Sequence, residues 1–514
     1  MIKRALISVS DKTGLVDLAK SLHDLGIELI STGGTASALQ SAGLPVIPVS
    51  DLTGFPECLD GRVKTLHPKI HGGILAIRGN PEHMQRISEL GIETIDLVII
   101  NLYPFKATVQ KPGVSLQECI ENIDIGGPSM LRAAAKNYND VTVATDPEDY
   151  ARIISEIREN GDTSQSTRFY LAKKVFEQTA AYDALIASYF QKQSPQQETP
   201  QQLTLTYDLI SSLRYGENPH QKASFYKEAL TVTGSLPHAR QLSGKELSYN
   251  NIADTDAALA LLKEFNEPAV IAVKHANPCG AACADDIETA WNKAYEADSV
   301  SIYGGIVALN RPVTAAVAAS MKPVFLEVVV APSYDSEALE ILGSKKNLRL
   351  LELPDAAVPY ERGSVMLKHV YGGLLVQDLD TETFNSDEIT VPTKAKPDKS
   401  MQDDLEFAMK VVKHVKSNAI VLVKDRQTVG IGPGQPNRIT SAQISIKNAG
   451  DKARGSILGS DAFFPFADTV EAASEAGIAA IIQPGGSIRD QESIDACDAK
   501  GIVMLMTGMR HFRH

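Results

Sequence analysis

The sequence has few cysteines, no long apolar run and no excess of positive charge. Its 514 residues include five cysteines, which are odd in number and scattered, whereas a secreted disulfide framework needs an even set at regular spacing. We therefore expect a reducing compartment, with the cytoplasm as the default location. No apolar run reaches the roughly 18 residues that a membrane-spanning helix needs, and the first residues lack the apolar stretch of a signal peptide. No membrane partner is expected.

Acidic residues outnumber basic ones, 63 to 50, which gives a net charge of −13. A generally basic surface for nucleic acid or anionic membranes is therefore not expected, and any anionic ligand must be held by local donors. Hydrophobic residues make up 43% and charged residues 22% of the chain, as in ordinary globular proteins. At about 150 residues per domain, the length predicts roughly three domains.

The N-terminal part of the chain alternates short apolar runs with helical patterns, the rhythm of strand–helix units around a mostly parallel sheet. Apolar residues recur at helical spacing over residues 15–25, and Gly26 stands where a glycine ends such a helix. A short helix is predicted over residues 36–42. The predicted strands cover residues 5–9, 27–30, 45–49, 96–101 and 141–144. The first half is therefore predicted to be an α/β domain.

A polar segment separates this part from the rest of the chain. Residues 191–202 read QKQSPQQETPQQ, with no aliphatic residue, a composition that cannot form a packed core. We predict a boundary there, with domains over residues 1–195 and 203–514. A second polar stretch, residues 381–400, is expected to divide the second domain into two subdomains. This second half is also predicted to be α/β, with buried strands at residues 269–273, 325–330, 419–423, 477–482 and 501–506.

Two loops in the first half each follow a predicted strand and open a helix. One contains Ser10 and Lys12, and the other is the run Thr32-Gly33-Gly34-Thr35. Helix N-termini present unpaired N–H groups and a positive dipole end, so both loops suit a phosphate group. Either loop alone is better explained as a helix-capping turn. Two such loops in one small domain favour a phosphate site.

Cations and histidines crowd residues 60–73, a segment with little apolar periodicity. The segment includes Arg62, Lys64 and Thr65. Its two histidines are four residues apart, but a proline stands between them and the H-E-x-x-H pattern is missing, so no metal pair is expected. We interpret the segment as part of a site rather than as core.

Two more segments place polar side chains beside predicted strands and turns. Asn101 and Tyr103 lie at the carboxyl end of a predicted strand, the edge where open α/β sheets bind ligands. Residues 123–137 join Asp124 to a glycine turn and a helix that ends near Lys136. The structural alternatives are simple packing for Tyr103 and a helix-dipole role for Lys136.

In this order, the motifs SVSDKTGL, STGGT, GRVKTLHP, NLYPF and IDIGGPSMLRAAAKN closely resemble the inosine monophosphate (IMP) cyclohydrolase domain of the bifunctional purine-biosynthesis family. The resemblance implies a methylglyoxal-synthase-like fold over residues 1–195 and the dehydrative ring closure of a formylated nucleotide to IMP. It assigns the main proton transfer to Lys136, and the orientation and polarisation of the reacting groups to Tyr103, Asp124 and Lys64. The substrate-binding residues that it implies are Ser10, Lys12, Thr32, Gly33, Gly34, Thr35, Arg62, Thr65 and Asn101.

A predicted strand in the second half ends in adjacent basic residues, Lys274 and His275. A histidine accepts a proton near neutral pH and an ammonium group stabilises developing negative charge, although a lone histidine is by default structural. The segment also echoes the zinc-deaminase motifs. Asn277 stands where the proton-shuttling glutamate belongs, and Cys279 and Cys283 have three residues between them instead of two. No catalytic metal is expected.

The motifs LRYGENPHQ, KHANPCG, YGGIVALN, GIGPGQPNR and SDAFFPF look like the formyltransferase domain of the same family. The resemblance implies, over residues 203–514, two cytidine-deaminase-like subdomains without the catalytic zinc, and formyl transfer from 10-formyltetrahydrofolate to 5-aminoimidazole-4-carboxamide ribonucleotide (AICAR). His275 is the implied base, and Lys274 either stabilises the oxyanion or assists the leaving nitrogen of the folate. The implied nucleotide contacts are Arg214, Tyr215, Gly304, Glu327, Asn418, Arg438, Phe463 and Arg510, with Ser487 and Ile488 near the folate.

The family resemblance also implies a homodimer that takes only small-molecule nucleotide and folate substrates. A function of another class remains open at this point, because enzyme-like folds also serve without catalysis. In that alternative, the chain is a nucleotide-binding regulatory protein with inactive enzyme-like domains. The presence of Lys136, Lys274 and His275 argues against it.

Overall fold

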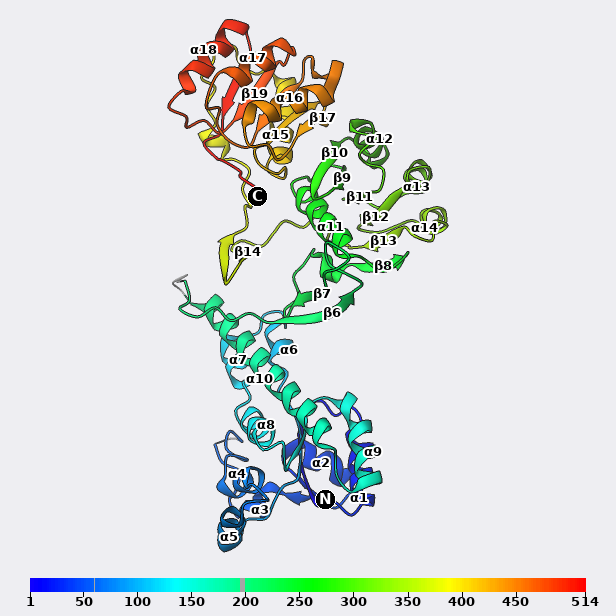
Figure 1. Cartoon of the computed structure of the whole chain (residues 1–514), viewed down its shortest axis with the longest axis vertical. Coiled ribbons are helices and arrows are strands. Elements are labelled where there is room, and N and C mark those ends of the chain that lie inside the picture. The colour runs from blue at the N-terminus through cyan, green and yellow to red at the C-terminus, as the bar shows by residue number, and fades with distance from the viewer. Residues whose placement is uncertain (60, 195–198) are drawn as a thin grey trace. The chain divides into compact units, whose positions relative to one another are not determined.

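The computed structural model describes residues 1–59, 61–194 and 199–514, which form two compact units (Figure 1). Unit 1 is Met1–Asp208 with Glu228–Leu230, and unit 2 is Leu209–Lys227 with Thr231–His514. Part of the polar segment at 191–202, namely residues 195–198, lies outside the described residues. The domain boundaries at 195 and 203 stay a prediction.

Unit 1 is built on a five-stranded sheet in the order β3-β2-β1-β4-β5, and all of its pairings are parallel. This confirms the predicted parallel α/β domain. Each strand overlaps its predicted segment, and the bounds are β1 (Arg4–Val9), β2 (Glu28–Ser31), β3 (Ile47–Pro48), β4 (Leu97–Asn101) and β5 (Thr142–Ala144).

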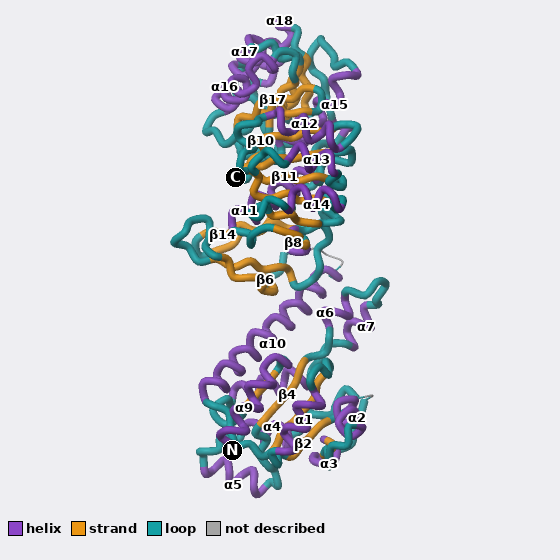
Figure 2. The backbone as a smooth tube through the Cα atoms, turned by 90° about the vertical axis from the view of Figure 1, so that its right-hand side faces the viewer, coloured by secondary structure: helices purple, strands orange, loops and turns teal. Residues whose placement is uncertain are grey.

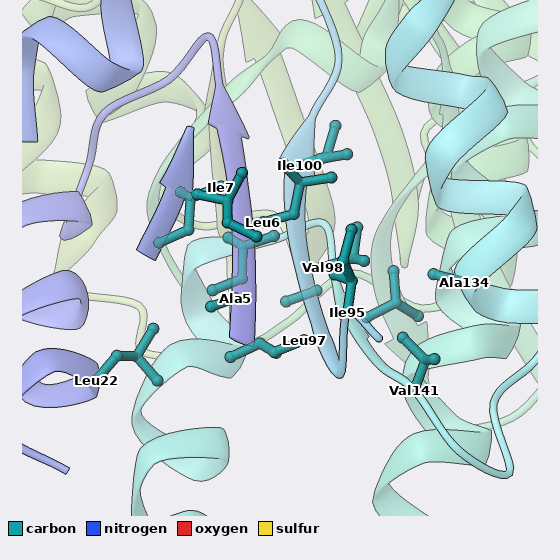
Figure 3. Close-up of a cluster of buried hydrophobic side chains, with 14 of the residues drawn as sticks. Ala5, Leu6, Ile7, Leu22, Ile95, Leu97, Val98, Ile100, Ala134 and Val141 are labelled. Atoms are coloured by element: carbon teal, nitrogen blue, oxygen red, sulfur yellow. The ribbon is translucent and has the colours of Figure 1, made fainter. Parts of the chain in front are cut away.

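The core of unit 1 forms because its central strands are apolar on both faces. Side chains of β1 and β4 lie next to one another beneath the flanking helices (Figure 3), and a buried leucine contributes about 2 kcal/mol to such a core. The first helix buries Leu15, Leu18 and Leu22 along one stripe and ends before Gly26, whose φ of 77° is readily adopted by glycine.

Helices connect and cover these strands (Figure 2). Among them, α8 and α10 pack on each other and on β5. None of the helices in the described part of the chain is both long and apolar enough to cross a bilayer. The bounds are α1 (Leu15–Asp24), α2 (Gly33–Ser41), α3 (Val49–Thr53), α4 (Pro68–Leu75), α5 (Pro81–Glu89), α6 (Phe105–Val109), α7 (Leu116–Glu121), α8 (Gly126–Lys136), α9 (Tyr150–Asn160) and α10 (Gln165–Gln193).

Unit 2 is built on a mixed sheet of eleven strands in the order β20-β19-β18-β16-β17-β10-β9-β11-β12-β13-β8. The five strands predicted from apolar runs correspond to β9, β12, β16, β19 and β20. The sheet strands are β8 (Arg240–Ser243), β9 (Ala269–Lys274), β10 (Asn277–Cys283), β11 (Gly305–Leu309), β12 (Leu326–Ala331), β13 (Arg349–Glu352), β16 (Ile420–Lys424), β17 (Gln427–Gly432), β18 (Ile457–Ser460), β19 (Ala480–Gln483) and β20 (Val503–Met506).

The sheet of unit 2 consists of two lobes with the same order of elements: a helix, an antiparallel hairpin, and then three helix–strand pairs. We call residues 249–352 the first lobe, drawn in green in Figure 1, and residues 399–506 the second lobe, drawn in orange and red. The lobes join through β10 and β17, which pair at Ala282 and Gln427. The helices are α11 (Tyr249–Leu262), α12 (Ile287–Ala297), α13 (Ala315–Met321), α14 (Ser336–Gly343), α15 (Lys399–Val412), α16 (Arg438–Ala449), α17 (Asp468–Glu475) and α18 (Asp490–Lys500).

Two hairpins stand outside this sheet, β6 (Tyr207–Leu213) with β7 (Ala223–Glu228), and β14 (Val365–Val370) with β15 (Gly373–Asp378). The second hairpin exposes a set of apolar side chains along both strands. The exposed residues are Val365, Met366, Val370, Leu374, Leu375 and Val376, together with Tyr371 at the turn.

A half-buried carboxylate, Glu264, ties the first lobe to the second. Glu264 accepts a hydrogen bond of 2.8 Å from His414, and the ammonium of Lys413 lies 2.9 Å away. Burial favours the neutral carboxyl, but the hydrogen bond and charge of His414, together with the Lys413 ammonium, outweigh it and lower the pKa of Glu264 to about 2. Burial also lowers the pKa of His414, against the opposing effect of the Glu264 carboxylate.

The low pKa of Glu264 predicts a loss of stability in acid. The folded state binds this proton less tightly than the unfolded chain does, so the contribution is complete above the ordinary value of 4.5 and is lost as the pH falls towards about 2. Glu264→Gln should therefore lower the melting temperature at neutral pH and flatten its decline in acid. Fluorescence of Trp291, the sole tryptophan and a buried residue of unit 2, measures this transition. The exposed control Glu288→Gln should melt like the parent at every pH.

Candidate functional site

Unit 1 encloses a cavity of about 640 Å³ where the loops after its strands meet the starts of its helices. Segments far apart in the sequence contribute to it, from the loop after β1 to the first turn of α8. Twelve of the residues singled out in the sequence line this cavity: Ser10, Lys12, Thr32, Gly33, Gly34, Thr35, Arg62, Lys64, Thr65, Asn101, Tyr103 and Asp124.

Asn101 fixes the loop that follows β1. Its Oδ1 atom accepts hydrogen bonds from the backbone N–H groups of Ser10, at 2.6 Å, and Asp11, at 2.9 Å, while its Nδ2 donates to the Asp11 carbonyl. The Asn101 amide is therefore engaged with the protein on both sides. It positions Ser10 and Lys12 at the cavity wall from the end of the adjacent strand.

The N-terminus of α2 opens on the same cavity. Thr32 stands at its N-cap position without a side-chain cap, so the N–H groups of the first turn have no partner within the helix. The hydroxyl of Thr35 is buried and bonds the backbone of Val9 as both donor and acceptor, each at 3.0 Å. Thr35 thus anchors the helix to β1, and its donor hydrogen is used. The backbone donors of this turn suit an anion.

Three cationic side chains line the cavity, and they differ in exposure and in their ion-pair partners. Lys64 is half-buried, and its ammonium lies 3.0 Å from Glu57 Oε1 and faces Gly33. Arg62 forms an ion pair with Glu121 at the rim. Lys12 is exposed. Of the segment at 60–73, residue 60 lies outside the described residues.

Asp124 lines the cavity, and backbone N–H groups hold its carboxylate. Its Oδ1 accepts from the N–H of Gly127 at 2.8 Å and its Oδ2 from that of Tyr103 at 3.3 Å. Burial raises the pKa of Asp124, against the opposing effect of these two hydrogen bonds. A Cβ atom at Gly127 would lie 2.5 Å from Asp124 Oδ2, so any side chain there would displace the Asp124 carboxylate from this position.

Sequence reasoning missed Tyr182, whose hydroxyl forms a hydrogen bond with the backbone of Asp124. The Asp124 N–H donates to the Tyr182 hydroxyl at 2.9 Å, and burial raises the pKa of this phenol to about 12, so it stays neutral. Tyr182 lies within the long helix α10, where nothing in the local sequence distinguishes it from a packing residue.

Lys136 lies away from this cavity. It is the last residue of α8, whose first residues Gly126 and Gly127 line the cavity. Ten residues of helix separate the two ends, which amounts to about 15 Å. Lys136 is exposed and is not among the described residues that line the cavity. Its place suits a cation at the negative end of the helix dipole, and its part in proton transfer stays a prediction.

In unit 2, Lys274 and His275 stand at the turn between β9 and β10. His275 is exposed and Lys274 is half-buried. The Lys274 ammonium donates to the Tyr303 carbonyl at 2.7 Å, which places it beside Gly304, another predicted substrate contact. Glu327 follows on β12, where Arg349 pairs with it at 2.5 Å.

Asn277, which sequence analysis treated only as a departure from a zinc motif, links this turn to the second lobe. Its Nδ2 donates to the His275 carbonyl at 3.2 Å, and its Oδ1 accepts from the N–H of Lys416 at 3.1 Å. Lys416 is two residues before Asn418. The structure therefore connects the predicted catalytic turn of the first lobe with a predicted nucleotide contact of the second.

Arg438 is buried and bonded to protein groups. Its guanidinium forms an ion pair with the fully buried Asp461 and donates to Ser460 Oγ at 2.9 Å and to Asn418 Oδ1 at 2.7 Å. This arrangement orients Asn418. The predicted direct contact between Arg438 and a nucleotide stays a prediction.

Removal of the Arg438 side chain should destabilise unit 2. Arg438→Met would leave Asp461 buried without its counterion, which costs about 3–5 kcal/mol. Urea unfolding followed by Trp291 fluorescence should show a clearly lower midpoint. An unchanged midpoint with weakened nucleotide binding would instead identify Arg438 as a substrate contact.

The remaining predicted residues of unit 2 lie on exposed loops. Arg214 stacks over the ring of Tyr215 just after β6, and Arg510 stacks over Phe512 near the C-terminus. Phe463 is partly exposed at 37%. Ser487 and the fully exposed Ile488 lie in the loop between β19 and α18.

Together, the fold and the two sites are those of an α/β enzyme, with a cavity in unit 1 whose helix N-terminus suits an anion and a lysine–histidine turn in unit 2. The MGS-like domain model matches residues 14–129, and the AICARFT/IMPCHase bienzyme model matches residues 134–448. The chain belongs to the AICARFT/IMPCHase bienzyme family.

Curated relatives match over the full length of the chain. The bifunctional purine biosynthesis proteins PurH of Acetivibrio thermocellus and Bacillus subtilis are 59% and 58% identical to it, and each alignment covers 100% of both chains. The crystal structure of ForH is 39% identical over 37% of this chain and 96% of that chain, with a TM-score of 0.34. The chain is thus a bifunctional enzyme of the last two steps of IMP synthesis, with AICAR formyltransferase and IMP cyclohydrolase activities.

Proposed function

We propose that the cavity of unit 1 performs the cyclohydrolase step and that the Lys274–His275 turn of unit 2 performs formyl transfer. The observation that carries the first assignment is that twelve predicted residues, from separate segments, line one cavity with an open helix N-terminus. A nucleotide phosphate fits the α2 N-terminus with Ser10 and Lys12. The base of the nucleotide then extends towards Lys64, Tyr103 and Asp124.

Ring closure joins two groups of one molecule, so the cavity mainly has to hold a reactive conformer and move protons. The carboxamide nitrogen attacks the formyl carbon, a carbon–nitrogen bond forms, and water leaves after proton transfer. Asp124 is the carboxylate available to take the amide proton. Lys64 supplies positive charge to the formyl oxygen as it becomes an oxyanion.

In unit 2, the exocyclic amine of AICAR attacks a formyl carbon that 10-formyltetrahydrofolate supplies. The amine is conjugated and weakly nucleophilic, so removal of its proton by His275 assists attack. Lys274, held at the Tyr303 carbonyl, either stabilises the oxyanion or assists the folate nitrogen as it leaves. Ser487 and Ile488 are the proposed folate contacts, and the fully exposed Ile488 offers the pteridine an apolar surface.

The proposed assembly is a homodimer in the cytoplasm. The β14–β15 hairpin exposes apolar side chains on both strands, and surfaces of this kind are usually covered by a partner. Analytical sedimentation tests the dimer. A monomer at concentrations that support full formyl transfer would contradict it.

The experiment that tests the proposed function is to mix AICAR and 10-formyltetrahydrofolate with the enzyme and follow tetrahydrofolate and IMP. Turnover to both products is expected. Nucleotide binding without turnover of either step would support the alternative of a regulatory nucleotide-binding protein.

A further inference from the structure

The two lobes of unit 2 close their hairpins in the same unusual way. In the first lobe, His275 and Ala276 have φ angles of 54° and 57°, and in the second lobe Asp425 and Arg426 have 55° and 53°. Residues with a side chain avoid this left-handed region because Cβ crowds the carbonyl oxygen. A group that accepts hydrogen bonds from the turn would therefore stabilise each of them.

An aspartate from the first helix of each lobe supplies that group. Asp254, the sixth residue of α11, accepts from the N–H groups of His275 at 3.1 Å and Ala276 at 2.7 Å. Asp404, the sixth residue of α15, accepts from those of Asp425 at 2.8 Å and Arg426 at 2.5 Å. Both carboxylates are half-buried. Both lobes therefore hold their turn in the same way, with one aspartate carboxylate that accepts from two successive backbone N–H groups. We call this arrangement the aspartate clamp.

The side chains on the two turns differ. A lysine precedes each turn, Lys274 in the first lobe and Lys424 in the second, and each donates to the carbonyl that precedes an equivalent glycine. The next residue is His275 in the first lobe but Asp425 in the second. A residue able to act as a base near neutral pH is therefore clamped in the first lobe alone.

We propose that Asp254 is a positioning residue for formyl transfer, because its carboxylate fixes the backbone from which the His275 imidazole projects. The proposal rests on the proposed function of His275. A base works only within hydrogen-bond reach of the proton that it removes, and small misplacements of a catalytic group reduce the rate strongly. The carboxylate acts through the backbone N–H groups and touches no substrate.

The second lobe provides a matched control. Asp254→Asn leaves one carbonyl oxygen for two N–H donors, and Asp404→Asn makes the same change at the equivalent turn. We expect Asp254→Asn to lower kcat of formyl transfer by about 10- to 100-fold, with the KM for AICAR within about twofold of the parent. Asp404→Asn should leave both constants within about twofold. Trp291 fluorescence melts report whether unit 2 is folded in each variant.

A double variant keeps the test decisive if Asp254→Asn folds poorly. Ala276→Gly removes the Cβ that disfavours the left-handed turn, so Asp254→Asn with Ala276→Gly should melt near the parent yet keep the loss of kcat. Full recovery of kcat in the double variant, or equal losses in Asp254→Asn and Asp404→Asn, would overturn the proposal. His275→Ala distinguishes failure of the proposed function of His275 from failure of the positioning role of Asp254. If His275→Ala stays active in formyl transfer, the proposed function of His275 is wrong. If His275→Ala is inactive while Asp254→Asn is fully active, only the positioning role of Asp254 is wrong.

Discussion

His275→Ala is expected to lower formyl transfer by about 10²- to 10⁴-fold, the range that general acid–base groups contribute, and to leave cyclisation unchanged. The imidazole is exposed at the end of β9, on a turn that the backbone holds in one conformation. Without it, the conjugated amine of AICAR loses its proton acceptor during attack. Lys274 cannot replace it, because its Nζ is already engaged as a donor to the Tyr303 carbonyl.

The measurement is a pair of assays on one preparation. Tetrahydrofolate release from AICAR and 10-formyltetrahydrofolate reports formyl transfer, and IMP formation from supplied formylated nucleotide reports cyclisation. The control is His238→Ala, which removes a histidine from the short turn before β8. Loss of both activities in a folded His275→Ala protein would contradict the division of the two reactions between the units.

Asp124→Asn should lower cyclisation by about 10²-fold or more without an effect on formyl transfer. Asparagine keeps the shape of the side chain but cannot accept the amide proton, and its NH₂ group faces one of the two N–H donors of Gly127 and Tyr103. The raised pKa of Asp124 also predicts that the parent loses cyclisation activity, on the acid side, at a higher pH than an ordinary aspartate would cause. Protonation removes the base, so this decline should vanish in the variant.

Initial rates of IMP formation from the formylated nucleotide across pH check this expectation. Asp140→Asn is the matched control, since this carboxylate accepts one backbone N–H, from Arg78, outside the cavity. A variant Asp124→Asn with parental rates would assign the proton transfer to another group. Lys136→Met is then the informative comparison, because it tests the residue at the far end of α8.

The strands of unit 1 could be predicted because they are apolar on both faces, as β1 and β4 illustrate. Boundaries were less accurate: the helix predicted to start at residue 36 begins at Gly33, because glycines of a phosphate-type loop enter the first turn. Two subdomains were expected in unit 2 from the polar stretch at residues 381–400 and from the family resemblance, but the residues alone did not show that both repeat one order of elements. The two lobes lie about 150 residues apart and share few side chains, among them Asp254 and Asp404, whose common task is visible only as hydrogen bonds to a turn.

Most of the predicted residues of unit 1 line one cavity, and they could be grouped from the sequence because they lie in short motifs with recognisable phosphate and turn chemistry. Tyr182 was missed since it reaches Asp124 from a helix that is distant in sequence. The engagement of Arg438 with Asp461 was also invisible, because a sequence gives the charge of a side chain but not its partner. The motifs therefore indicated which residues to consider, but the hydrogen-bond and ion-pair partners of those residues became visible only in the folded structure.

The pairing of β10 with β17 has a consequence for any attempt to separate the lobes of unit 2. These strands are central in the eleven-stranded sheet, but each would become an outer edge in an isolated lobe. An unprotected edge of this kind recruits strands of other molecules and leads to aggregation. Each lobe therefore covers the open edge of the other, and a fragment of unit 2 that does not aggregate must retain both lobes.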